Sequence, residues 1–157
     1  MNNDLSHVRP DGQPGMVNVG SKEPTHRTAI AESWIRIPAN VAESLEQGDL
    51  HTPKGPVFQT AIIAGTLGAK QTHQLIPFCH PLPIDGCDID IALEGERIRI
   101  RCTVHVFHKT GVEMEALTGA TVAALTVYDM CKSLSHDLFI EETRLVSKTG
   151  GKSDVGA

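Results

Sequence analysis

The chain has 157 residues, of which 40% are hydrophobic and 21% are charged, so it is long enough to fold as one domain around a substantial core. Its formal net charge of −5 argues against a protein that holds nucleic acid by bulk positive charge. No apolar run approaches the ~20 residues of a membrane span, and residues 1–5 lack the basic and apolar regions of a signal peptide. We therefore expect a cytoplasmic protein that binds neither nucleic acid nor a membrane.

The beginning of the chain is polar and irregular. Residues 1–15 contain two prolines and two glycines, a composition typical of a mobile tail. Residues 16–27 follow without clear periodicity and carry Lys22, His26 and Arg27. This segment is either solvated surface or a basic loop over a bound anion.

A strand and two helices are predicted next. A short strand covers residues 33–37 and is stopped by Pro38, and a short helix covers residues 41–45. The stronger prediction is a helix over residues 57–71, in which alanine or glycine recurs at every fourth position on one side. A helical glycine such as Gly65 costs up to ~1 kcal/mol against alanine, so tight packing or a subunit contact must account for this stripe.

The loop at residues 75–83 is stiffened by three prolines, which would hold Cys79 and His80 in fixed positions. Adjacent residues on extended backbone point in opposite directions, so a Cys79 thiolate activated by His80 is disfavoured. The remaining cysteines are Cys87, Cys102 and Cys131. The four show no CxxC spacing, which indicates reduced thiols rather than a disulfide framework or a zinc knuckle.

A β-hairpin is predicted from the alternation of apolar and polar residues over 87–93 and again over 98–106. Gly95 supplies the positive φ that a two-residue turn between them requires. The resulting register pairs an acid with an arginine at two places, Asp90 with Arg101 and Glu94 with Arg97. These arginines are then cross-strand partners rather than ligands.

The best helix of the sequence covers residues 112–132. One face is apolar and repeats at three- and four-residue steps, through Ala116, Ala120, Ala123, Val127, Met130 and Cys131. A second stripe carries Glu115 and Asp129, and Lys132 lies one turn beyond Asp129, as either a simple ion pair or part of a site. Glu115 and Asp129 are about 21 Å apart at ~1.5 Å rise per residue. Either the ligand is long, or a neighbouring subunit brings one group beside the other.

A last strand is predicted for residues 138–147. The order strand, helix, hairpin, helix, strand favours one α+β domain over residues 16–153, between tails at 1–15 and 154–157. The economical arrangement is ferredoxin-like, a four-stranded antiparallel sheet with two main helices packed on one face.

The segment 147–153 contains a Gly-Gly-Lys run that lacks the first glycine and the following helix of a Walker A motif. Its backbone amides, with Lys148 and Lys152, could still wrap an anion. A frayed terminus fits the sequence equally well.

With these motifs in order, the chain resembles the MoaC family, the cyclic pyranopterin monophosphate synthases of molybdenum cofactor biosynthesis. The resemblance spans about residues 16–153. It rests on seven motifs, Met16–Val19, Lys54–Gly55, Ile63–Gly65, Leu75–Leu82, Thr110–Thr118, Val122–Lys132 and Lys148–Ser153. Motifs of this length, in this order and spacing, are highly specific.

The resemblance implies a lyase. Its substrate would be the 3′,8-cyclised dihydro-GTP made by the preceding radical SAM enzyme, and its products cyclic pyranopterin monophosphate and diphosphate. The resemblance also implies a homohexamer, a trimer of dimers, with active sites between subunits. It requires no cofactor and assigns no metal ligand, although Mg²⁺ could accompany the triphosphate.

Position by position, the resemblance makes Asp129 the catalytic carboxylate and gives the acid–base work to Lys132 and Lys54. The residues that match substrate contacts are Phe78, Cys79, His80, Met114 and Glu115, and those that match the triphosphate end are Lys148, Lys22 and Arg27. Crowding the two acid–base lysines with substrate in a desolvated pocket would lower an amine pKa from its usual ~10.4. Proton transfer near neutral pH needs such a shift.

Two other readings stay open. The family usually has Asp, Ser, Asp, Arg and Arg at the positions of Asn18, Gly20, Pro56, Ile62 and Gln71, so the chain could be a divergent, non-catalytic module that binds purine nucleotides or a partner enzyme. A metal-dependent hydrolase is the weakest alternative, because the eight histidines show no ligand spacing.

Overall fold

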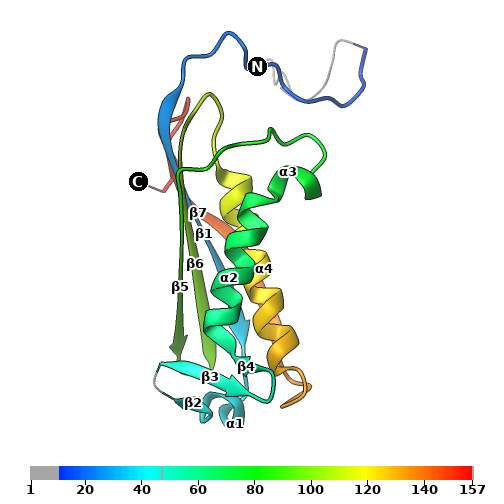
Figure 1. Cartoon of the computed structure of the whole chain (residues 1–157), viewed down its shortest axis with the longest axis vertical. Coiled ribbons are helices and arrows are strands. Elements are labelled where there is room, and N and C mark those ends of the chain that lie inside the picture. Colours follow the sequence, from blue (N-terminus) through cyan, green and yellow to red (C-terminus); the bar gives the residue numbers. More distant parts are fainter. Residues whose placement is uncertain (1–10, 47, 157) are drawn as a thin grey trace.

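The computed structural model describes residues 11–46 and 48–156, so most of the predicted tail at 1–15 lies outside the described residues. Figure 1 shows the elements in chain order. They are β1 (Thr25–Arg36), α1 (Ala39–Ala42), β2 (Leu45–Glu46), β3 (Asp49–Thr52), β4 (Gly55–Pro56), α2 (Val57–Lys70), α3 (Thr72–Leu75), β5 (Gly86–Glu94), β6 (Arg97–His108), α4 (Glu113–Cys131) and β7 (Phe139–Thr149). Among the described residues, no helix is both long and apolar enough to cross a membrane.

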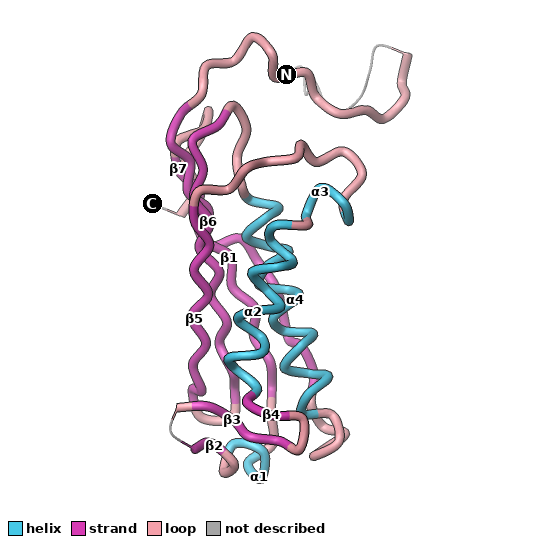
Figure 2. The backbone as a smooth tube through the Cα atoms, viewed as in Figure 1, coloured by secondary structure: helices cyan, strands magenta, loops and turns pink. Residues whose placement is uncertain are grey.

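The main sheet has four antiparallel strands in the order β5-β6-β1-β7. The long helices α2 and α4 lie side by side on one of its faces (Figure 2). The core between sheet and helices is formed by apolar residues such as Ile35, Ile100 and Val127, all fully buried. The predicted ferredoxin-like α+β fold is confirmed.

The stripe of small residues on α2 is explained by its contact with α4. A Cβ atom added at Gly65 would lie 2.7 Å from the backbone oxygen of Gly119 and 2.6 Å from Ile89 Cδ1. One added at Gly68 would lie 2.8 Å from Val122 Cγ2. The two helix backbones therefore approach closely only because side chains are missing there, which confirms tight packing as the reason for the glycines.

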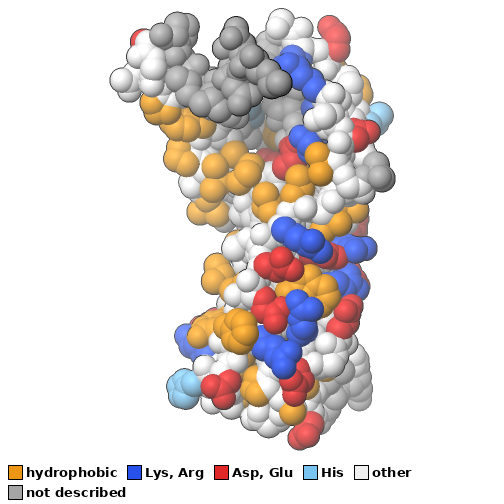
Figure 3. All heavy atoms as spheres, turned by 180° about the vertical axis from the view of Figure 1, so that it is seen from behind, with side chains coloured by type: hydrophobic (Ala, Val, Ile, Leu, Met, Phe, Trp, Pro, Cys, Tyr) orange, Lys and Arg blue, Asp and Glu red, His pale blue; other side chains and the backbone are white. Residues whose placement is uncertain are grey.

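The hairpin register is confirmed, with Asp90 opposite Arg101, Glu94 opposite Arg97, and a φ of 65° at Gly95. The acids therefore face these arginines as predicted, but their side-chain bonds go elsewhere. Asp90 and Glu94 bond the diagonally placed Arg99, whereas Arg101 bonds the residue that lies opposite it on β1. The partners of the arginines are Glu94 (2.8 Å) and Asp90 (3.3 Å) for Arg99, Glu32 (2.7 Å) for Arg101 and Glu141 (2.7 Å) for Arg97. The arginines are paired within the sheet, as predicted. Figure 3 shows basic and acidic side chains interleaved on the side of the molecule away from the helices.

Some features differ from the prediction. The short helix α1 covers Ala39–Ala42 rather than residues 41–45. The first strand begins at Thr25 rather than residue 33, because β1 lies inside the sheet and pairs with β6 on one side and β7 on the other. Ladder hydrogen bonds hold its irregular first half extended, and no side-chain alternation is needed. The short strands β2, β3 and β4 form a small second sheet at the end of the molecule where α2 begins (Figure 1).

Candidate functional site

The predicted site residues gather at the two ends of α4. At its N-terminal end lies a cavity of about 350 Å³, here called the pocket. The pocket is lined by Val17, Val19, Lys22, Arg27, Phe78, Cys79, His80, Leu82, Thr110, Gly111, Glu113, Met114, Glu115 and Lys152. At the C-terminal end of α4, Lys54 and Lys132 meet Asp129, and these three residues are here called the charge cluster.

Four segments that are distant in the sequence build the pocket. They are the stretch that leads into β1 with the start of that strand, the proline-rich loop after α3, the turn before α4 with the first turn of that helix, and the glycine-rich segment after β7. The stretch before β1 is held in place by its backbone, because His80 Nε2 bonds the oxygen of Val17 at 2.7 Å and Lys109 Nζ donates to the oxygen of Gly20 at 2.8 Å. The predicted basic loop therefore lies against the pocket.

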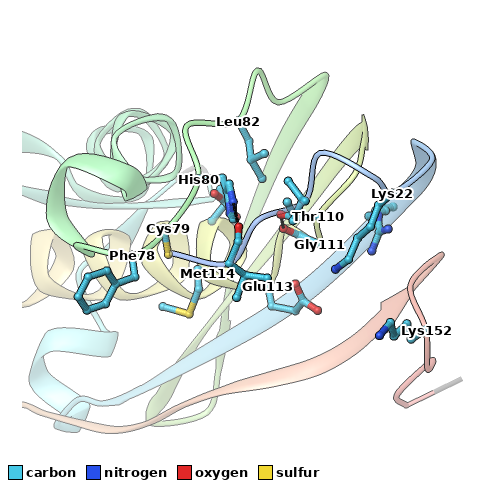
Figure 4. A pocket seen from close by; sticks show the side chains of 14 residues that line it. Lys22, Phe78, Cys79, His80, Leu82, Thr110, Gly111, Glu113, Met114 and Lys152 are labelled. Carbon is cyan, nitrogen blue, oxygen red and sulfur yellow. Dashed lines mark hydrogen bonds between the residues drawn. The ribbon is translucent and has the colours of Figure 1, made fainter. Parts of the chain in front are cut away.

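The pocket has an apolar end and a cationic end. In Figure 4, Phe78 and Met114 lie at one end, and Lys22 and Lys152 lie at the other. Arg27 adds a third cation; its Nε donates to the oxygen of His108 at 3.0 Å, which fixes the guanidinium beside the cavity. An elongated ligand with a flat apolar part and an anionic tail matches this division.

Glu115 is the buried acid of the pocket, with 4% of its surface exposed. Burial, with a smaller contribution from the nearby charge of Glu113, raises its pKa from 4.5 to about 7. Near neutral pH this carboxyl group can therefore give or take a proton, which is the property of a general acid or base.

Cys79 and His80 line the pocket without forming a nucleophilic pair. Burial, and then the charge of Glu115, raise the pKa of the Cys79 thiol, which keeps it protonated. A backbone oxygen can only accept, so His80 Nε2 must carry its proton where it bonds Val17. The expectation that this pair is not a catalytic dyad agrees with these contacts.

The glycine-rich end of the chain folds back onto the pocket. Lys148 and Val155 form an isolated antiparallel bridge, so the alternative of a frayed terminus is wrong for the described residues 147–156. Gly150 has a φ of 83°, and a Cβ atom there would lie 1.9 Å from the oxygen of His26. This close turn, which only glycine fits, brings Lys152 to the cavity, while Lys148 Nζ contacts Glu113 Oε1 at 3.1 Å.

The charge cluster joins residues from two elements on one carboxylate. Lys54, in the turn between β3 and β4, donates to Asp129 Oδ2 at 2.9 Å and to the backbone oxygen of Asp129 at 3.0 Å. Lys132 Nζ contacts Asp129 Oδ1 at 2.7 Å. The prediction that Lys132 is the neighbour of Asp129 is confirmed, and Lys54 comes from 75 residues earlier in the chain.

The ion pairs of the charge cluster shift the pKa values of both the acid and the amine. Hydrogen bonds from Lys132 and then Lys54 lower the pKa of Asp129 to about 2, and the bond to Asp129 raises the pKa of Lys132. About half of each side chain in the cluster is exposed. The expected desolvated pocket with a lowered amine pKa is therefore not what residues 11–46 and 48–156 of a single chain provide, because none of them covers these amines.

Some lining residues were outside the predicted site. Lys152 and Glu113 line the pocket but were not among the predicted site residues. The Gly-Gly-Lys run pointed to Lys152 as a possible anion contact, and Glu113 is the sequence neighbour of the predicted Met114. Val17 and Val19 are ordinary apolar residues, and only the folded path of the chain brings them to the cavity.

Comparisons with known proteins agree with one another. The sequence model of the MoaC family matches residues 16–151. A protein of Xanthomonas oryzae pv. oryzae named "Cyclic pyranopterin monophosphate synthase" is 59% identical over 154 residues, 98% of this chain and 93% of the relative. A protein of the same name from Xanthomonas axonopodis pv. citri is 58% identical with the same coverage. A "Molybdenum cofactor biosynthesis bifunctional protein" of Synechocystis sp. is 47% identical over 156 residues, 96% of this chain and 45% of the relative.

Proposed function

The chain belongs to the MoaC family, and from that premise we infer that it is a cyclic pyranopterin monophosphate synthase of molybdenum cofactor biosynthesis. It is a lyase that acts on a small GTP-derived molecule. The substrate is (8S)-3′,8-cyclo-7,8-dihydroguanosine 5′-triphosphate, and the products are cyclic pyranopterin monophosphate and diphosphate. The preceding step, carried out by a radical SAM enzyme, supplies that substrate.

The two ends of the pocket support a binding direction. Lys22, Arg27 and Lys152 form the cationic end, which suits the triphosphate and the diphosphate that leaves. Phe78 and Met114 form the apolar end, where the flat ring system can pack. The proposal assigns no resident cofactor to the chain, and any Mg²⁺ arrives as a companion of the triphosphate.

The proton carriers follow from the protonation states. With a pKa of about 2, Asp129 stays ionised at neutral pH, so it orients the two lysines rather than delivering protons. Lys54 and Lys132 then act as the acid and base amines, and Glu115, with a pKa of about 7, exchanges a further proton inside the pocket.

A complete site needs two copies of the chain. Glu115 and Asp129 are fourteen residues apart on one straight helix, about 21 Å, so one small reacting centre cannot touch both. We propose that the charge cluster of one subunit closes over the pocket of another, within the hexamer that the family resemblance implies. Enclosure would also strip water from Lys132 and lower its pKa toward the range that catalysis needs.

The observation that carries this proposal is the meeting of Lys54 and Lys132 on Asp129 in a member of this family. The test is to incubate the purified protein with the cyclised GTP derivative and to follow pyranopterin and diphosphate by mass spectrometry. Turnover supports the function. Nucleotide binding by calorimetry without turnover would instead identify a non-catalytic module.

The shared site has its own test in mixed oligomers. Lys132→Ala breaks the charge cluster, and His80→Ala breaks the pocket, so each variant alone should be inactive. If every site combines two chains, a refolded equimolar mixture should regain about a quarter of wild-type activity, because half of the pairs are mixed and hold one intact site. No regain on mixing would place each site within a single chain.

The cellular setting is part of the proposal. All four cysteines are free thiols in the structure. Free thiols are compatible with the reducing cytoplasm that the sequence predicts.

A further inference from the structure

We propose that Asp49 is a positioning residue that holds Lys54 against Asp129 and Lys132. The proposal rests on the proposed function, in which the Lys54 amine transfers protons. Asp49 lies in β3, outside the pocket and the charge cluster, and only 5% of its surface is exposed.

Asp49 caps the beginning of α2 from a neighbouring strand. Its Oδ1 accepts from the backbone N–H of Phe58 at 2.6 Å, and its Oδ2 accepts from that of Gln59 at 3.1 Å. These are the second and third residues of α2, whose amides a local N-cap side chain would normally bind. The residue at the N-cap position is Pro56, which makes no side-chain cap, so the carboxylate of Asp49 replaces it.

The same bonds fix the hairpin that carries Lys54. Thr52 lies opposite Gly55, which leaves Lys54 in the two-residue turn between β3 and β4. Extending this register along β3 would bring Asp49 opposite Phe58, the residue whose amide it binds. The backbone pairing of β3 with β4 stops where β4 turns into α2. Beyond that point the carboxylate of Asp49 supplies the hydrogen bonds that join β3 to the helix.

The tip of the hairpin is tied to α4 through Lys54. That contact is an ion pair between half-exposed side chains with one added bond to the backbone oxygen of Asp129, and exposed ion pairs hold little structure by themselves. Asp49 also lies near the end of α4, since its negative charge adds to the burial that raises the pKa of Cys131 to about 11. The buried carboxylate of Asp49, at the base of the hairpin, is thus what keeps the Lys54 amine at a constant position relative to Asp129.

The experiment separates positioning from helix capping. Asp49→Asn weakens both roles, because an amide group can accept only through its single oxygen. Pro56→Asp adds an ordinary N-cap that can bind the amides of Phe58 and Gln59, and its extended backbone, with φ −70° and ψ 127°, suits that position. The double variant therefore has a capped helix and an untied hairpin, and Pro56→Asp alone is the matched control.

We expect Asp49→Asn to lower both the thermal midpoint and kcat, the latter at least about tenfold, with KM changed less than about threefold, since misplaced acid–base groups slow chemistry more than binding. The double variant should regain the thermal midpoint but not kcat. Hydrogen exchange of the peptide 49–56 should stay faster than in the wild-type protein. Recovery of kcat together with the thermal midpoint would overturn the proposal, because Asp49 would then be a helix cap and nothing more.

Failure of the proposed function gives a different result. If the wild-type protein does not turn over the GTP derivative, hydrogen exchange alone decides the role of Asp49. Faster exchange over residues 49–56 in the double variant, with α2 unchanged, then supports the anchor, and unchanged exchange in both segments overturns it.

Discussion

The two ends of α4 place the same kind of side chain in opposite environments. Glu115 lies buried in the pocket, and its pKa rises to about 7. Asp129 lies exposed between two lysines, and its pKa falls to about 2. The difference teaches that burial makes a carboxyl group a proton carrier, whereas pairing makes it a permanent anion that arranges its neighbours.

Removing an amine from the charge cluster should have the largest effect. We expect Lys132→Ala to lower kcat by about 10²-fold or more, because positioned acid–base groups contribute on that scale. The thermal midpoint should stay unchanged, since the lysine is half exposed. The measurements are product formation by mass spectrometry and calorimetric melting.

The matched control is Lys70→Ala, which removes an exposed lysine from the last turn of α2. It should turn over substrate like the wild-type protein. Equal rates for Lys132→Ala and Lys70→Ala would remove the catalytic role of the cluster.

At the pocket end of α4, the raised pKa of Glu115 should make the stability of the protein depend on pH. The folded chain holds the Glu115 proton up to a pKa of about 7, while the unfolded chain releases it near 4.5. The contribution of Glu115 to the free energy of unfolding is therefore fully present below pH 4.5 and falls by up to about 3 kcal/mol as the pH rises past 7. Glu115→Gln should remove this slope.

Urea unfolding at pH 5 and pH 8 measures the slope, at one fixed protein concentration because the chain is expected to assemble. Parallel pH curves for the wild-type protein and Glu115→Gln would show that Glu115 has an ordinary pKa. The corresponding variant at the other end, Asp129→Asn, should leave the slope between pH 5 and 8 as it is, because Asp129 titrates near pH 2.

The close contact between α2 and α4, which lies between the two ends of α4, should be sensitive to one added methyl group. Gly65→Ala places a Cβ atom 2.7 Å from the Gly119 oxygen, and a backbone atom cannot rotate away. We expect a loss of about 1–3 kcal/mol in unfolding free energy, as for other overpacked cores. Ile63→Ala, on the exposed side of the same helix, should cost much less in the same urea titration. Equal losses would mean that α2 and α4 tolerate separation.

The smallest effect is expected at the cationic end of the pocket. Lys152→Ala removes one of several cations, so we expect KM to rise about tenfold while kcat changes little. Because the contact is electrostatic, the difference from the wild-type protein should shrink at high salt. A fall in kcat at unchanged KM would show that Lys152 acts in the chemical step.

Regular patterns made much of the fold predictable. The small, apolar stripe from Ala116 to Cys131 predicted α4 to within about a residue at each end, and the alternation about Gly95 predicted the register of β5 and β6. The first half of β1 has no such pattern. Its extended shape comes from hydrogen bonds to strands that lie far away in the sequence, which no local reading can supply.

The sequence supplied candidate site residues but not their full arrangement in space. Family motifs named Lys54, Asp129 and Lys132, and the structure shows that they touch. Asp49 carries no motif that links it to Lys54, because its role depends on which amides lie beside a strand after folding. The ion pairs of the hairpin could not be predicted for a similar reason. Arg99 bonds two acids that lie diagonally across from it, and Arg101 bonds Glu32 on the neighbouring strand β1.

The near-contact of backbones at Gly65 and Gly119 has a mechanical consequence. Two helices that interlock without intervening side chains behave as a stiff spacer, and they cannot slide or bow by even the width of a methyl group at low cost. The distance from one end of the molecule to the other is thus a constant of the protomer. Within one chain, any change in the spacing between the pocket and the charge cluster must come from the loops at the ends.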